Sequence, residues 1–297
     1  MASRPLTLTV YYLAYSASSL DVQSSYVFLQ NLISLSSFQL TQEPALLAKN
    51  FNVRYKLLSN YLLIEDWFVE LLDSMRIELV KVEDVCNPLI PLIQVEAIVN
   101  SFHSDTSDCQ LFLDGDTTFI RPYVHEVAIA LFDGCGELAM AHECGSTGVS
   151  PYPNYNCGFI MTLPTDTVGT LFNKWRSLCN TNRELVGHGN QRLFPYALRF
   201  TRPKILTIDN VYNLRCHQVF GGASQVWSPV YMVHSHELTR YMLQRCRSSG
   251  VLFTESLTSK HFDNIKSILA SVDEHMTPRD QPFLPRYISC PPLIPVS

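Results

Sequence analysis

Apolar and polar positions along the chain follow strand-like and helix-like periods in turn. Residues 6–14, rich in β-branched and aromatic side chains, run into the polar stretch Tyr15-Ser-Ala-Ser-Ser, which is typical of a strand followed by a loop. From 21 to 35, apolar residues recur at helical spacing, so a helix is predicted next. The same patterns predict later strands at 51–58, 76–82, 137–142, 156–163 and 226–234, and helices at 66–75, 88–101, 123–132, 166–179, 190–199, 237–248 and 258–272.

Strands that alternate with helices predict parallel β-α-β units, and therefore an α/β protein with a mostly parallel central sheet flanked by helices. No linker or internal repeat interrupts this pattern, so residues 1–276 are expected to form one domain with a helical C-terminal part. Residues 277–297 are rich in proline and are expected to form a tail.

An apolar run that begins at Cys109 delivers Asp114 and Asp116 at the point where it stops being apolar. This pattern predicts a buried strand whose end presents two carboxylates, with Gly115 leaving the space between them open. Such a pair suits a hard divalent cation whose other positions are filled by water or phosphate oxygens. Asp-x-Asp alone is weakly specific, because Asp-Gly is also a common turn dipeptide.

Residues able to bind a ligand fall at three predicted strand ends: Tyr15 and Ser16, Asp114 and Asp116, and His234 and His236. In open parallel sheets, ligands bind beyond the carboxyl ends of the strands, so the sequence predicts one site built from these ends. Tyr15 has two interpretations, because an aromatic residue at a strand position can stack on a nucleobase but more often packs in the core.

Composition narrows the function classes. The chain of 297 residues is 46% hydrophobic and has a net charge of −5, which argues against a nucleic-acid-binding protein with its basic face. No apolar run reaches the ~18 residues of a membrane span, and no signal-peptide pattern is recognised, so a cytosolic location is expected. The nine cysteines are odd in number and lack Cys-x-x-Cys spacing, which favours reduced, mostly buried thiols.

Taken in order, the motifs resemble the GT-A class of nucleotide-sugar-dependent glycosyltransferases, especially retaining families with a Leu-Asp-x-Asp motif. The resemblance spans roughly residues 6–240. It is carried by the first strand and loop, Leu113-Asp-Gly-Asp116, Asn156-Cys-Gly158, a helix bearing Trp175, Gln191 at the start of a short helix, Tyr212-Asn213 and Val233-His234. No single motif is specific, and the ordered set is the signal.

The resemblance implies that Asp114 and Asp116 hold Mn²⁺ or Mg²⁺, which bridges the two phosphates of the donor. By the same resemblance, Asp116 is expected to coordinate the ion directly, and Asp114 is expected to contact the ribose of the donor in part. His234 matches a late-strand histidine that completes the metal site, and an imidazole ligand favours Mn²⁺. His236 is the rival, because residues two apart in a strand share a face. Either histidine can instead be a solvated residue at a strand end.

Four further positions take roles from the resemblance. Tyr15 and Ser16 belong to the loop that holds the nucleotide. Asn156 and Gly158 match the Asn-x-Gly motif, in which the amide contacts the donor sugar or the acceptor and the glycine permits close approach of backbone to ligand. Without the resemblance, a turn before a strand explains Asn156 and Gly158 equally well.

The sequence departs from the family at a catalytic position. Gln191 matches the glutamine of an Asp-Gln pair, but Asn190 stands where the aspartate is expected. An amide cannot act as a nucleophile or a base, so this position is expected to orient hydroxyl groups. Glu143 is the remaining, weak candidate for carboxylate assistance.

A second departure concerns charge. Many relatives carry a basic residue on the helix before the Asp-x-Asp strand, but this chain has no Lys or Arg between Lys81 and Arg121. Neutralisation of the diphosphate is then expected to fall mainly on the metal, with help from Arg121, His188 or Arg192.

The predicted function is transfer of a sugar from a nucleotide-diphosphate-sugar donor to a hydroxyl-bearing acceptor, with retention of configuration on the resemblance alone. One alternative is a metal-dependent hydrolase that uses His234-Ser-His236-Glu237 with the two aspartates. Another is a catalytically silent relative that binds a nucleotide sugar or a partner protein through the same cleft. The sugar, nucleobase, acceptor and oligomeric state are left open.

Overall fold

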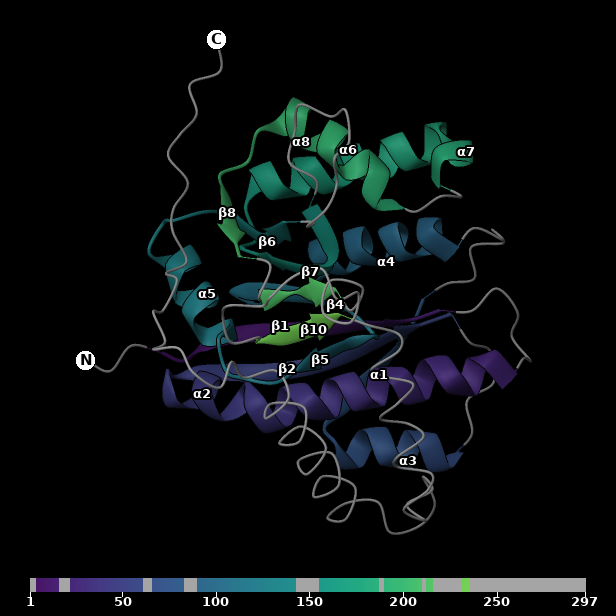
Figure 1. The fold of residues 1–297 in the computed structure, drawn as a ribbon, viewed down its shortest axis with the longest axis vertical. Coiled ribbons are helices and arrows are strands. Elements are labelled where there is room, and N and C mark those ends of the chain that lie inside the picture. The colour runs from purple at the N-terminus through teal and green to yellow at the C-terminus, as the bar shows by residue number, and fades with distance from the viewer. Residues whose placement is uncertain are drawn as a thin grey trace, which may run out of the picture.

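A seven-stranded sheet forms the centre of the protein in the computed structural model, which describes residues 4–15, 22–60, 66–82, 90–142, 155–186, 190–209, 212–215 and 231–234. The strand order is β3-β2-β1-β4-β7-β6-β8 (Figure 1). The strands are β1 (Leu6–Ala14), β2 (Phe51–Ser59), β3 (Ile77–Lys81), β4 (Cys109–Asp114), β6 (Leu138–His142), β7 (Tyr155–Thr162) and β8 (Ile205–Ile208). Only β7 runs antiparallel to its two neighbours, so the predicted mostly parallel α/β sheet is confirmed.

Helices cover both faces of this sheet (Figure 1). One face carries α1 (Val22–Thr41), α2 (Glu43–Ala48), α3 (Asp66–Ser74) and α5 (Val124–Phe132). The other face carries α4 (Ile90–Ser104), α6 (Asp166–Thr181) and α8 (Phe194–Thr201). Two short elements, α7 (Arg183–Val186) and the 3-10 helix η1 (Asn190–Leu193), connect α6 to α8.

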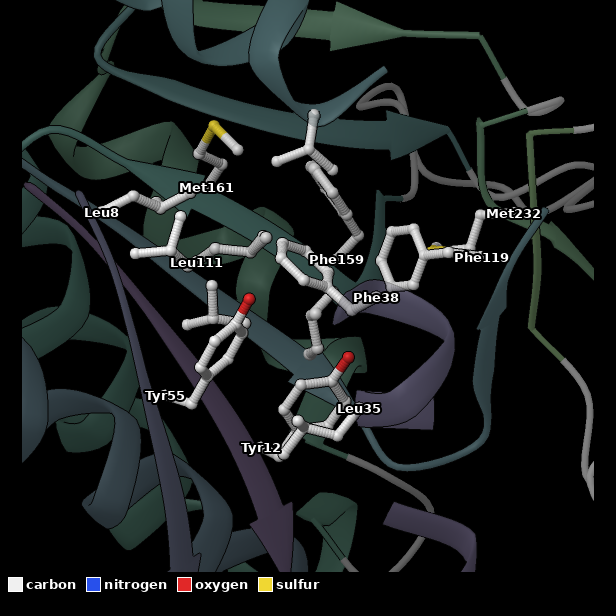
Figure 2. Packing of buried hydrophobic residues seen from close by; sticks show 14 of the residues in the cluster. Leu8, Tyr12, Leu35, Phe38, Tyr55, Leu111, Phe119, Phe159, Met161 and Met232 are labelled. Carbon is white, nitrogen blue, oxygen red and sulfur yellow. The ribbon is translucent and has the colours of Figure 1, made fainter. Parts of the chain in front are cut away.

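Strand β1 shows why both faces need a cover. Its alternate side chains Val10 and Tyr12 pack with α1 and α3 in one hydrophobic cluster, while Tyr11 and Leu13 pack with α4 and α6 in a second. Successive residues of a strand point to opposite faces, so an almost fully apolar strand is buried on both. Figure 2 shows part of the first cluster, in which Tyr12 lies near Leu35 and Phe38 lies near Phe119.

A second, smaller sheet has the order β5-β10-β9, formed by β5 (Thr117–Phe119), β10 (Met232–His234) and β9 (Leu214–Arg215). Strand β10 is antiparallel to β5 and parallel to β9. The expectation that the histidine-bearing strand belongs to the central sheet is therefore wrong. Its partner β5, which directly follows the aspartates, has only three residues and is too short to show a period in the sequence, so the second sheet was not predicted.

Most predicted elements are present, with boundaries shifted by a few residues. The short α2, α7, β8 and β9 were not predicted, and the predicted helix 190–199 divides into η1 and α8. The predicted helices 237–248 and 258–272, the tail 277–297 and the boundary at 276 lie outside the described residues. Among the described helices, none combines the length and apolar character needed to cross a membrane.

Candidate metal centre

The two aspartates lie in a turn that joins the sheets. Asp114 ends β4, and β5 begins at Thr117, directly after Asp116. The Thr117 hydroxyl donates to the backbone carbonyl of Asp114 at 2.9 Å, and its oxygen lies 2.8 Å from the hydroxyl oxygen of Ser34 on α1. These bonds fix the turn against the buried side of α1, so both carboxylates have defined positions.

The pairing of β10 with β5 brings His234 to the aspartates. His234 lies opposite Thr117 in the antiparallel register, and Thr117 directly follows Asp116 in the chain. Its Nε2 lies 3.1 Å from Oδ1 of Asp116 and 3.5 Å from Oδ2 of Asp114. One ligand atom from each of the three residues falls within 4.8 Å of the others, so residues 120 positions apart in the chain form one cluster.

The cluster is largely buried, which increases the repulsion between its two carboxylates. Asp116 and His234 are 7% and 8% exposed, whereas Asp114 is partly exposed. Two carboxylates close together in a site of limited solvent access repel each other unless a cation lies between them. Two carboxylate oxygens and one imidazole nitrogen form a donor set that suits Mn²⁺ and, with less preference, Mg²⁺. The residues therefore fit the metal that the sequence predicted.

Asn156 and Gly158, at the start of β7, complete the surroundings of His234. Nδ2 of Asn156 lies 3.2 Å from Nδ1 of His234, and Oδ1 of Asn156 accepts the backbone N–H of Gly158 at 2.8 Å. An amide nitrogen can only donate, so Nδ1 is the acceptor and the ring proton of the neutral imidazole is on Nε2, toward the carboxylates. A metal bound through Nε2 would replace that proton.

Gly158 is needed for the histidine to approach β7. A Cβ atom built on Gly158 would lie 2.3 Å from Cε1 and 2.7 Å from Nδ1 of His234. It would also lie 3.0 Å from Oδ2 of Asp114. Both distances to the ring are shorter than any ordinary van der Waals contact, so only glycine leaves room for His234 beside the aspartates.

Gly115 has a role that the sequence did not indicate. A Cβ atom there would lie 2.5 Å from Nδ2 of Asn31, whose side chain is buried and donates to the backbone carbonyl of Val27. The space above the Asp-Gly-Asp turn is thus filled by an α1 side chain. The sequence interpretation, that glycine leaves the space between the carboxylates open, missed this packing because nothing in the local pattern pairs residue 31 with residue 115.

Gln191 lies beside the same strand. Its Oε1 accepts the backbone N–H of Cys157 at 3.1 Å, so the carboxamide is fixed against the Asn-Cys-Gly segment. Asn190 begins η1, directly before Gln191. The structure thus brings Gln191 to the segment that contacts His234.

The other predicted residues have separate outcomes. Tyr15 is buried in the cluster with α4 and α6, and burial raises the pKa of its hydroxyl well above the ordinary value. Arg192 is exposed on η1, and the backbone N–H of Arg121 donates to the carbonyl of Tyr231. The further candidates Ser16, His236, Glu143, His188 and Glu237 lie outside the described residues.

Four cysteines fall in the described part of the chain, and the structure has each of them as a thiol: Cys109, Cys135, Cys157 and Cys179. Burial raises the pKa of Cys109 and of Cys179 to about 12, so neither is a thiolate at neutral pH. For these four residues, the prediction of reduced thiols is confirmed.

Comparisons with known proteins agree with this fold. No family model matches the chain, and no curated protein matches it by sequence. Among solved structures, the glycosyltransferase GlyE of Streptococcus pneumoniae TIGR4 matches with a TM-score of 0.52 and 16% identity, over 94% of this chain and 67% of that one. The galactosyltransferase LgtC, solved with donor and acceptor sugar analogues, matches with a TM-score of 0.50 and 12% identity, over 89% of this chain and 95% of that one.

These matches identify the fold. The chain has the GT-A fold of glycosyltransferases, with an Asp-x-Asp motif at the end of β4. The resemblance read from the motifs is confirmed at this level. At such low identity, activity and substrates do not follow from the matches alone.

Proposed function

We propose that the protein is a metal-dependent glycosyltransferase that moves a sugar from a nucleotide diphosphate to a hydroxyl-bearing acceptor. The observation that carries this proposal is the convergence of Asp114, Asp116 and His234 at the carboxyl end of β4. In α/β sheets, ligands bind at such strand ends. The GT-A fold of the structural neighbours supports the reaction class. Retention of configuration and a cytosolic location stay predictions.

The proposed chemistry divides between the ion and the protein. When bound, a divalent ion would supply a Lewis acid for the charge that develops on the leaving diphosphate. Asp114, Asp116 and His234 would hold the ion. Asn156 orients the imidazole by a hydrogen bond to Nδ1, the ring nitrogen that does not face the carboxylates.

The remaining site residues would position substrates. Gln191, fixed against Cys157, and its neighbour Asn190 are assigned to orienting hydroxyl groups of the sugar or acceptor, because neither amide can serve as a base. Gly158 permits close approach of backbone to the ligand. Tyr15 and Ser16, which follow β1, are assigned to the nucleotide side of the site, Tyr15 through its backbone because its side chain is buried in the core.

Asp114→Asn and Asp116→Asn test the proposal, because each removes one charge and keeps nearly the same shape. With a panel of nucleotide sugars and Mn²⁺, the rate of transfer or of slow donor hydrolysis should fall by a factor on the order of 10² or more in each variant. Asp73→Asn, which changes an exposed carboxylate on α3, is the matched control and should keep the parent rate.

The same assay separates the alternatives. Hydrolysis of unrelated esters with no use of nucleotide sugars would identify the hydrolase, and saturable binding of nucleotide sugars without turnover would identify the silent relative. If either aspartate variant kept its activity but unfolded at a much lower temperature, that residue would have a structural role.

A further inference from the structure

The outer surface of α8 carries aromatic and basic side chains together. Tyr196 and Phe200 are 58% and 65% exposed, although both are large and could have been buried. Arg199 is exposed on the same helix, three residues after Tyr196 and one before Phe200. Positions three and four apart share one side of a helix, so these three side chains form one stripe. We call Arg192, Tyr196, Arg199 and Phe200 the α8 face.

The inner side of α8 explains why these residues point outward. Phe194, Ala197 and Leu198 are buried, and the Phe194 ring packs edge-on against Trp175 of α6 at a centroid distance of 4.9 Å. This packing fixes the rotation of the helix. The exposed aromatic residues therefore lie on a rigid helix that is anchored to the core.

The segment that carries the α8 face contains basic residues but no acidic ones. No acidic residue occurs from Leu185 to Ile208, although the whole protein has a net charge of −5. Arg192 is exposed on η1 just before the helix, and the Lys174 ammonium lies 4.5 Å from the centre of the Phe200 ring. The two arginines and two rings of the α8 face, with Lys174 beside them, are complementary to an anionic partner although the protein as a whole is acidic.

We propose that the α8 face is a docking surface for an anionic lipid membrane. A bilayer surface presents a layer of negative headgroups and an apolar layer beneath it, which matches a face with both arginines and exposed rings. Tyrosine and long basic side chains suit this interface, because each has an apolar body and a polar end. Nucleic acid is disfavoured by the net negative charge of the protein.

This docking surface adjoins the candidate site. Arg192 directly follows Gln191, whose carboxamide is fixed against β7 beside the metal cluster. A protein docked through the α8 face would therefore hold the Gln191 side of its site near the membrane. The inference goes beyond the proposed function and does not depend on it, since binding to lipid is measured without a sugar donor or a metal.

Sedimentation of the full chain with lipid vesicles tests the proposal. The parent protein should sediment with vesicles that contain phosphatidylserine, should bind phosphatidylcholine vesicles weakly, and should be released by salt. Arg192→Gln with Arg199→Gln should lower the partition coefficient by about fivefold for each arginine. Tyr196→Ala with Phe200→Ala should lower it on both kinds of vesicle.

The matched control changes similar residues on the opposite side of the sheet. Leu47→Ala on α2, which is 55% exposed, and Lys49→Gln at the end of α2, which is also exposed, should leave vesicle binding at the parent level (Figure 1). Thermal unfolding of each variant confirms that the fold is kept. Equal vesicle binding by all variants would overturn the proposal. So would saturable binding to polyglutamate without binding to vesicles, which would identify an acidic protein as the partner.

Discussion

Gly158 is the residue that gives His234 its place. A Cβ at this position would lie 2.3 Å from the imidazole, and the ring has carboxylates on its other side. We predict that Gly158→Ala displaces the ring and weakens Mn²⁺ binding by about tenfold or more, since loss of a partner around a metal ligand already costs this much. Calorimetric titration of Mn²⁺ measures the effect.

The control for this variant is Gly169→Ala in helix α6, where the nearest side-chain atom would be 3.3 Å from the new Cβ. It adds the same methyl group far from the cluster and should leave Mn²⁺ affinity at the parent value. Unchanged Mn²⁺ affinity in Gly158→Ala would mean that His234 is not a ligand in the position described.

We predict different effects on the Mn²⁺ requirement when His234 or His236 is replaced. His234 lies in the cluster, whereas His236 falls outside the described residues. We therefore expect His234→Ala to raise the Mn²⁺ concentration needed for activity by about tenfold or more, and His236→Ala to change it little. Activity measured against Mn²⁺ concentration separates them. A larger loss in His236→Ala would mean that the assignment of the strand end is wrong by two residues.

At the residue scale, the sequence could predict the ligands but not their supports. Asp114 and Asp116 stand out because a strongly apolar run ends at them, and His234 ends another such run. Asn31, Ser34 and Thr117 hold the turn in place, yet they are ordinary polar residues of a helix and a short strand. Their role depends on contacts between α1 and the turn, such as that of Ser34 with Thr117, 83 residues away, which a local pattern does not contain.

At the scale of elements, two carboxylates tie the loop between α4 and β4 to strand β1. The Tyr11 hydroxyl on β1 donates to Asp105, which also accepts the backbone N–H of Ser107 at 2.9 Å. Asp108 accepts the backbone N–H of Thr7 at 2.8 Å and pairs with Arg4. Since β4 follows directly, these bonds help to set where the metal-binding strand begins.

Acid should weaken this connection. Burial raises the pKa of Asp105, but hydrogen bonds from Tyr11 and Ser107 outweigh it and hold the pKa below the ordinary value. A carboxylate with a lowered folded-state pKa stabilises the fold above its ordinary pKa and loses that contribution as the pH falls through the folded value. We predict that Asp105→Asn, which keeps an acceptor for Tyr11 but does not titrate, makes stability less dependent on pH below about pH 4.

Urea denaturation at several pH values checks this prediction. Asp105→Ala is the companion variant, and it should cost about 1–3 kcal/mol near neutral pH because the buried Tyr11 hydroxyl loses its acceptor. Asp73→Asn again serves as the control for loss of an exposed carboxylate. An Asp105→Asn protein with the parent dependence of stability on pH would show that Asp105 is not linked to folding.

Sequence periodicity predicted the long elements of the fold but not the short ones or the direction of the strands. The strands β1, β2 and β4 and the helices α4 and α6 are long and regular, and each was predicted within a few residues. The antiparallel direction of β7 was not predicted, because periodicity carries no information on strand direction. The three-residue β5 was missed, and with it the antiparallel pairing that delivers His234 to the aspartates.

At the scale of the whole molecule, the cluster of Asp114, Asp116 and His234 lies where the two sheets meet. The central sheet contributes Asp114 through β4 and Asn156 through β7, and the small sheet contributes His234 through β10. Neither sheet forms the cluster alone. Because the protein has a net charge of −5, two phosphate groups brought to this acidic strand end would be repelled without a cation.

Binding of a nucleoside diphosphate such as UDP or GDP, measured by calorimetry with Mn²⁺ and then with a chelator, tests the central claim most directly. We predict saturable binding with Mn²⁺ for at least one nucleotide, and affinity lower by a factor on the order of 10² or more with the chelator. Asp116→Asn with Mn²⁺ should bind as weakly as the parent with the chelator. Equal affinity with and without Mn²⁺ would contradict the account, because the cluster of Asp114, Asp116 and His234 would then not hold the ion that receives the diphosphate.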